Sequence, residues 1–132
     1  MTLTHINPDG MHANPAFSQA VLLDGPGRLL VIGGQNAVDP AGAVVGTDLA
    51  TQTARALENL LTVLAAVGGT REDVAKMTVY LVAGQDAREG FAASQRVWGQ
   101  HPTAISVLQV AALGRPEFLV EIDAIAYLPP RA

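Results

Sequence analysis

The sequence contains no cysteine among its 132 residues. Disulfide bonds and thiol catalysis are therefore excluded, and cysteine usage says nothing about the compartment. No uninterrupted apolar run approaches the roughly 18 residues needed to cross a bilayer, so we expect no membrane partner. The first ten residues, MTLTHINPDG, lack the basic and apolar segments of a signal peptide, which favours a cytoplasmic protein.

Charge is also scarce. Only 15% of the residues are charged, the net charge is −4, and the eight lysines and arginines form no basic run. This balance argues against nucleic-acid binding, which needs a basic surface. His5, His12 and His101 show no metal-ligand spacing with carboxylates, and Gly33-Gly34 lacks the lysine and the glycine spacing of phosphate-binding loops. We therefore expect neither a metal nor another cofactor.

Hydrophobic residues, in contrast, make up 49% of the chain. The length fits one domain, residues 1–132, with room for a proper core. The apolar share is nevertheless high for a small soluble domain. Because no membrane span accounts for it, association between subunits is the simplest way to bury the excess.

The segment Pro102–Leu128 predicts two apolar strands joined by a short polar link at 114–116. In the second strand every even position from 118 to 128 is apolar, the two-residue period of a strand with one buried face. The odd positions mix apolar side chains with carboxylates: Glu117, Leu119, Glu121, Asp123, Ile125 and Tyr127. Such a face suits neither a core nor open water, so we expect another subunit to cover it.

The remaining chain alternates strand and helix signals. We expect a short edge strand within 1–16, then strands at 19–23 and 28–32 around a hairpin turn at 24–27. A break at Gly33-Gly34 and a loop at 38–46 follow. The rest is expected to form a helix at 48–67, a single helical turn at 70–73, a strand at 74–83 and a second helix at 86–100. This order predicts an α+β fold in which one mixed sheet packs against two helices.

Five segments together resemble the RidA/YjgF family over nearly the whole chain: PAFSQAV (15–21), VIGGQNAVDPAG (31–42), QTARALENLLTVLAAVGG (52–69), REDVAKMTVYLV (71–82) and VAALGRPEFLVEIDAIA (110–126). The resemblance implies a chorismate-mutase-like fold and a homotrimer whose sheets form a central barrel, with clefts between neighbouring subunits. It also implies hydrolysis of reactive enamines and imines released by pyridoxal-phosphate enzymes. Some members carry endoribonuclease labels, which the acidic composition here does not favour.

The resemblance also marks candidate site residues. Glu121 matches the glutamate of a Val-Glu-Ile motif, which implies that it positions the attacking water. Four other positions depart from the family's deaminases. Ile105 stands for an arginine that binds the substrate carboxylate, Phe17 for a tyrosine, Gly33 for a serine and Gln95 for an asparagine. Loss of the arginine predicts a cleft that favours neutral or aromatic small molecules.

Other residues keep two interpretations. Arg115, in the link between the last two strands, either reaches across a subunit boundary to replace the lost charge or remains a solvated loop residue. Trp98 either lines a pocket for a flat ligand or, with Phe91 at helical spacing, belongs to the core. The Ser18 hydroxyl has no histidine partner in the sequence, so we do not expect a serine nucleophile.

Two functions from different classes follow. The first is an enzyme of the enamine or imine deaminase type, with altered substrate selectivity, acting in clefts between subunits. The alternative is a non-catalytic small-molecule-binding or regulatory trimer of the same fold. Glu121 is a general base in the first case, and in the second a carboxylate satisfied within an interface.

Overall fold

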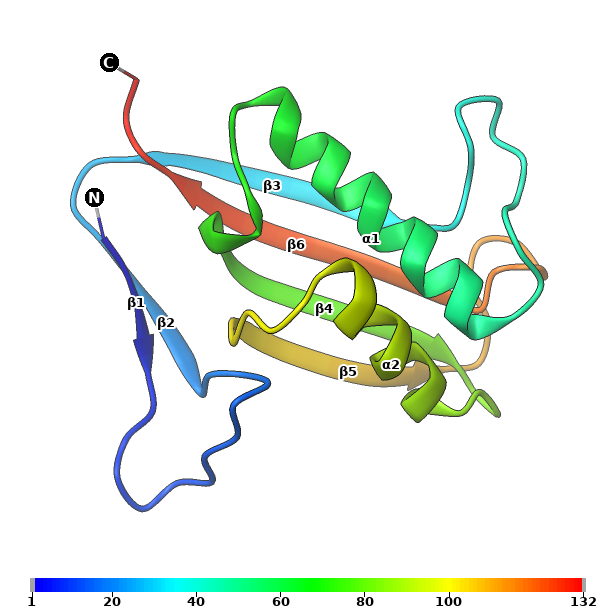
Figure 1. Ribbon diagram of the computed structural model, residues 1–132, viewed down its shortest axis with the longest axis horizontal. Coiled ribbons are helices and arrows are strands. Elements are labelled where there is room, and N and C mark those ends of the chain that lie inside the picture. The colour runs from blue at the N-terminus through cyan, green and yellow to red at the C-terminus, as the bar shows by residue number, and fades with distance from the viewer. Residues whose placement is uncertain (1, 132) are drawn as a thin grey trace.

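The computed structural model describes residues 2–131 as two layers (Figure 1). One layer is a four-stranded sheet with the order β3 (Arg28–Gln35), β6 (Val120–Leu128), β4 (Val74–Val82) and β5 (Ala104–Val110). The other layer consists of α1 (Leu49–Ala66) and α2 (Ala87–Val97), which cover one face of this sheet. The predicted α+β fold of two helices on a mixed sheet is confirmed.

Strand β6 occupies the centre of the sheet. It is antiparallel to both β3 and β4, whereas β4 and β5 run parallel. The even positions predicted to face the core are all buried: Phe118, Val120, Ile122, Ala124, Ala126 and Leu128. All of them except Phe118 belong to one core cluster with Leu57, Leu60 and Leu64 of α1. The two-residue period therefore identified the inner face of the sheet correctly.

Helix α1 begins and ends where its caps predict. The Asp48 carboxylate accepts a hydrogen bond from the backbone N–H of Thr51 at 2.7 Å, and Gly68 follows the helix with a φ of 75°. Val67, predicted as the last residue of the helix, is instead its C-cap and is exposed. No helix within residues 2–131 combines the length and the apolar character that crossing a membrane requires.

The predicted hairpin at 24–27 is wrong. Strand β2 (Ala20–Asp24) pairs with β1 (Thr2–Ile6) in a separate two-stranded sheet, seen at one end of the molecule in Figure 1. Strand β3 pairs instead with β6 along its whole length, from Arg28 opposite Leu128 to Gln35 opposite Ile122. Because β6 offers β3 a longer partner than β2 does, residues 24–27 form a corner between two sheets.

The expected break at Gly33-Gly34 is also corrected. Strand β3 continues through both glycines to Gln35, and only its register with β6 shifts between Ile32 and Gln35. A shift of this kind is a bulge, which bends a strand without ending it. The glycines therefore mark an irregularity inside the sheet.

Helix α2 (Ala87–Val97) is shorter than predicted. Gly90 and Ala93 are its buried residues. A methyl group added at Gly90 would lie 3.4 Å from side-chain atoms of Leu49 and Thr53, so the glycine lets α2 approach α1 closely. Phe91 is 54% exposed, and its assignment to the core is therefore wrong.

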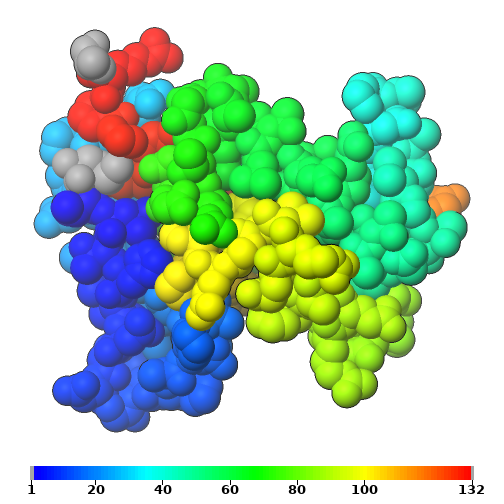
Figure 2. Space-filling view, in the orientation of Figure 1, coloured from blue at the N-terminus to red at the C-terminus, as the bar shows by residue number. Residues whose placement is uncertain are grey.

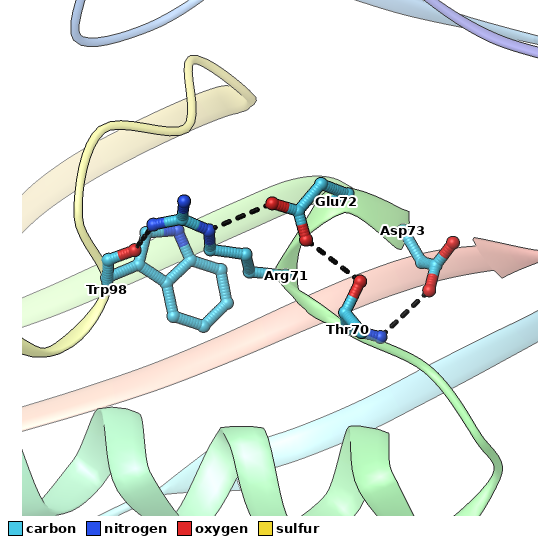
Figure 3. A network of polar contacts seen from close by, with 5 residues as sticks. All are labelled: Thr70, Arg71, Glu72, Asp73 and Trp98. Carbon is cyan, nitrogen blue, oxygen red and sulfur yellow. Dashed lines mark hydrogen bonds and ion pairs between the residues drawn. The ribbon is translucent and has the colours of Figure 1, made fainter.

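A single helical turn, η1 (Arg71–Asp73), precedes β4 as predicted. The Asp73 carboxylate accepts a hydrogen bond from the backbone N–H of Thr70 at 2.8 Å. Arg71 donates hydrogen bonds to the Glu72 carboxylate and to the backbone carbonyl of Trp98, as Figure 3 shows. This network ties the end of α2 to the start of β4.

Candidate functional site

Glu121 lies on the face of the sheet that the helices leave uncovered. It is half-buried and stands opposite Tyr80 of β4. A Cβ atom added at Gly34 would lie 2.6 Å from the Glu121 Cδ, so the glycine leaves room for the present position of this carboxylate. No side chain or backbone N–H within residues 2–131 donates a hydrogen bond to the Glu121 carboxylate. Its oxygens are therefore free to bind a water molecule.

The second carboxylate of this face is already paired. Tyr80 donates a hydrogen bond from its hydroxyl to the Asp123 carboxylate at 3.0 Å. That hydrogen bond raises the pKa of Tyr80 above its usual value, and burial and the negative charge of Asp123 act in the same direction. Of these two carboxylates, Glu121 is thus the one whose oxygens no hydrogen-bond donor within residues 2–131 occupies.

Two amide side chains of α1 fix the chain on either side of Glu121. The Gln52 Oε1 accepts a hydrogen bond from the backbone N–H of Leu119 at 2.9 Å, and this glutamine is fully buried. The Asn59 side chain donates at 3.0 Å to the carbonyl of Asn36, just past the bulge of β3. Neither residue belongs to a motif that the sequence alone marks as functional. A polar side chain next to the apolar stripe of α1 was the available signal.

A cavity of about 360 Å³ lies on the opposite face, between α2 and strands β4 and β5. Figure 2 shows a small hollow between α2 and the segment that follows it. Two of the predicted site residues, Gln95 and Ile105, line this cavity. Ala87, Phe91 and Ser94 of α2 and its C-cap residue Trp98 line it as well. The lining contains no charged side chain, which suits an uncharged ligand.

Ile105 and Glu121 do not meet within one chain. Ile105 stands beside Met77, which is buried under the helices, whereas Glu121 stands beside Tyr80 on the other face. Side chains of a strand alternate between the two faces, so positions 77 and 80 of β4 face opposite ways. The two predicted site residues can share one site only if another copy of the chain brings its own face alongside.

Phe17 lies near the cavity without lining it. The backbone N–H of Ser18 donates to the carbonyl of Thr103 at 2.9 Å, which holds this segment beside the start of β5. Ala16 contributes to the cavity lining, while Phe17 is half-buried with its ring centroid 6.1 Å from that of His12.

Gly33 and Arg115 lie in exposed segments. A Cβ atom added at Gly33 would meet nothing within 4 Å, unlike one at the adjacent glycine. Arg115 donates a hydrogen bond to the carbonyl of Gly42 at 2.8 Å, and its guanidinium lies 5.2 Å from the ring centroid of Phe118. These contacts hold Arg115 within its own chain, between two loops.

The structure brings together two histidines and a serine that the sequence keeps apart. The Ser18 Oγ lies 3.1 Å from the His5 Nδ1, so the expectation that Ser18 has no histidine partner is wrong. The rings of His5 and His101 meet edge to face, with centroids 5.5 Å apart. Burial lowers the pKa of His101, and the neighbouring His5 lowers it further.

This cluster lacks the features of a nucleophile or a metal site. The Ser18 hydroxyl also contacts the carbonyl of Pro102 as a donor, so its proton is engaged away from the histidine. Nowhere in residues 2–131 do three His, Cys, Asp or Glu side chains come close enough to hold a metal ion. The docking of β1 and β2 explains the cluster, because it brings His5 to the end of β5.

Residues 9–128 match the model of the family described as Endoribonuclease L-PSP. The chain belongs to this family, which is the RidA/YjgF family that the sequence resembles. A protein of unknown function from Yersinia pestis, of the conserved Rid protein family, has the same fold. Its structure superposes with a TM-score of 0.84 at 38% identity, covering 97% of this chain and 100% of that one.

Two relatives show how the family resemblance extends across organisms. A RutC family protein of Pyrococcus horikoshii is 36% identical over 84% of this chain and 86% of its own. The human protein named 2-iminobutanoate/2-iminopropanoate deaminase is 33% identical over 86% of this chain and 81% of its own. This RidA/YjgF chain therefore has relatives named for imine deamination.

Proposed function

We propose that this protein is a hydrolytic deaminase of the enamine and imine type with altered substrate selectivity, working in clefts between the subunits of a homotrimer. The observation that carries the proposal is the Glu121 carboxylate, which is packed against Gly34 and has no hydrogen-bond donor within residues 2–131. The names of the human relative and its rat counterpart support the same reaction type.

The uncovered face of the sheet supports assembly. Leu29 and Val31 of β3 are 62% and 71% exposed, and Val31 stands opposite Ile125 of β6, which is also exposed. A contiguous apolar face of this kind is a typical subunit interface. In the proposed assembly, the second copy that covers this face brings its own cavity, which Ile105 lines, beside Glu121.

The chemistry needs a base and a water. In the proposed reaction, Glu121 accepts a proton from water as the water oxygen adds to the carbon of the substrate C=N bond. Proton transfer to nitrogen then allows the C–N bond to break, and the products are a carbonyl compound and ammonia. An open carboxylate in a partly apolar cleft suits this role.

Selectivity follows from Ile105, which lines an uncharged cavity. A charge-assisted pair between arginine and a carboxylate contributes about 1.5–3 kcal/mol. Without it, binding of 2-imino acids should be weaker by about ten- to a hundredfold than in an arginine-bearing relative.

The test uses 2-aminoacrylate generated in place by a pyridoxal-phosphate enzyme, with pyruvate as the measured product. Slow turnover is expected for the wild type, at least tenfold more for Ile105→Arg, and none for Glu121→Gln. Ile105→Leu serves as the matched control and should behave as the wild type.

Two outcomes would contradict this account. If wild type and Ile105→Arg are both inactive while the trimer is intact, the alternative of a non-catalytic binding protein is favoured. Rapid wild-type turnover that Ile105→Arg leaves unchanged would mean that another cation holds the carboxylate, and Arg115→Ala would then test the nearest predicted substitute.

A further inference from the structure

Three buried side-chain atoms have no hydrogen-bond partner within residues 2–131: Thr53 Oγ1, Trp98 Nε1 and His101 Nε2. Buried polar atoms are normally paired, so each exception needs a cause. All three residues line the cavity beneath α2. Unsatisfied polar groups gathered around one cavity indicate a place where a ligand supplies the missing partner.

The chemistry of these atoms defines the partner. The Trp98 indole N–H only donates, and the Thr53 hydroxyl both donates and accepts. Burial keeps His101 neutral near pH 7, because it lowers the pKa of the imidazole. The group that fits the Trp98 and Thr53 donors is a neutral hydrogen-bond acceptor such as a carbonyl oxygen.

The other lining side chains are mainly apolar, and their exposure to solvent differs from one end of the cavity to the other. Trp98 and Thr53 are 5% and 4% exposed, whereas Phe91 and Val107, which also line the cavity, are each more than half exposed. The unpaired atoms therefore lie at the inner end, and the apolar side chains extend to the mouth. A carboxylate at the inner end would lose its water without meeting a cation.

The Trp98 donor is held in place before any ligand arrives. Arg71 donates a hydrogen bond to the Trp98 carbonyl, and the Trp98 backbone N–H donates to the carbonyl of Ser94 at 2.7 Å (Figure 3 shows the first of these). A fixed backbone restricts the side chain that it carries, and a donor with little freedom to lose binds its acceptor more strongly.

We propose that this cavity binds a neutral, mainly apolar molecule whose carbonyl oxygen is held by the Trp98 indole N–H and the Thr53 hydroxyl. The inference deepens the proposed function and rests on it in one respect: the same molecule class would be the substrate presented to a neighbour's Glu121. Recognition thus depends on the inner end of the cavity as well as on the position that Ile105 occupies.

The test exploits the fact that Trp98 is the only tryptophan. A ¹H–¹⁵N spectrum of the whole protein contains a single indole N–H signal, which is followed during titration with three probes of similar shape. Acetophenone carries a neutral carbonyl, benzoate a carboxylate, and ethylbenzene no acceptor. Acetophenone should shift the indole proton downfield and bind at least tenfold more tightly than either of the other two probes.

Matched variants of α1 separate recognition from folding. Thr53→Val removes the hydroxyl at nearly constant volume and should weaken acetophenone binding by about three- to tenfold, the effect of one hydrogen bond. Thr62→Val is the control, because the Thr62 hydroxyl donates to the carbonyl of Glu58 on the exposed side of the same helix. Its affinity should equal that of the wild type.

Benzoate binding as tight as that of acetophenone, or an indole signal that no probe moves, would overturn this inference. Equal affinities of Thr53→Val and wild type for acetophenone would overturn the role of Thr53. Turnover of 2-aminoacrylate is measured independently. Binding without turnover would contradict the proposed function alone, and turnover without acetophenone binding would contradict the present inference alone.

Discussion

The two faces of the four-stranded sheet are built from the same strands, but the helices cover one face and leave the other exposed. Along β6, Val120, Ile122 and Ala126 are at most 1% exposed beneath the helices, whereas Ile125 on the other face is 37% exposed. The inner face is completed by the chain itself. The outer face carries apolar side chains that the chain leaves uncovered, and it also carries Glu121.

This difference explains how the candidate site is divided. Within residues 2–131, the inner face provides an uncharged cavity with unpaired polar atoms, and the outer face provides a carboxylate that no hydrogen-bond donor contacts. The cavity lining thus has no carboxylate, and the carboxylate of the outer face lies away from the cavity. Within one chain the sheet separates the two halves, so the proposed site would form only where the outer face of one copy meets the cavity of another.

The largest effect is expected from breaking the outer face. Val31→Asp places a charge at a position that is 71% exposed in the single chain and is buried in the proposed trimer. An unpaired charge in an interface costs several kcal/mol, so subunit dissociation should increase by about a hundredfold or more. Size-exclusion chromatography with light scattering measures the mass.

Val67→Lys provides the control for this substitution. Val67 is also an exposed apolar residue but caps α1, away from the outer face of the sheet. It should leave the mass of the assembly unchanged. If Val31→Asp still forms the same assembly as the wild type, the outer face is not the subunit interface.

A smaller effect is expected from displacing Glu121 alone. Gly34→Ala would place a methyl group 2.6 Å from the Glu121 Cδ, so the carboxylate must move. Misplacing a catalytic group by about 1 Å can reduce the rate by up to a hundredfold, and at least a tenfold loss of kcat is expected for the deaminase reaction. Gly114→Ala, where an added methyl group meets nothing within 4 Å, should retain full activity. Equal activities of the two variants would argue against a role for the Glu121 position.

The smallest effect is a pH dependence on the cavity side. Burial, and then His5, lower the pKa of His101 below its usual 6.5, against smaller opposing contributions from a hydrogen bond to the Val74 backbone and from Glu72. Between that value and the lowered pKa the unfolded chain binds more protons than the folded one. Stability should therefore decline as the pH falls below about 6.5.

Thermal unfolding followed between pH 7.5 and pH 5 measures this decline. His101→Gln should flatten the profile over this range, whereas His12→Gln, which changes an exposed histidine, should not. A profile that His101→Gln leaves as steep as that of the wild type would show that other groups cause the decline.

Local patterns in the sequence were enough to predict most elements of the fold. The period of two at 118–128 identified the inner face of β6, and the Asp48 and Gly68 signals placed the ends of α1. Both depend on residues close together in the chain, and the physical preferences of caps and alternating strands act over that range. The family resemblance, now confirmed, came from the same segments.

Tertiary structure decided the pairings and the site. The turn at 24–27 has the composition of a hairpin, but β3 finds a longer partner in β6, more than 80 residues away. Likewise, nothing local shows that Ile105 and Glu121 face opposite ways, or that Thr53, Trp98 and His101 share one cavity. The sequence by itself determined which face of each element is apolar. Which faces meet was decided by long-range packing, because strand register and helix approach depend on partners distant in the chain.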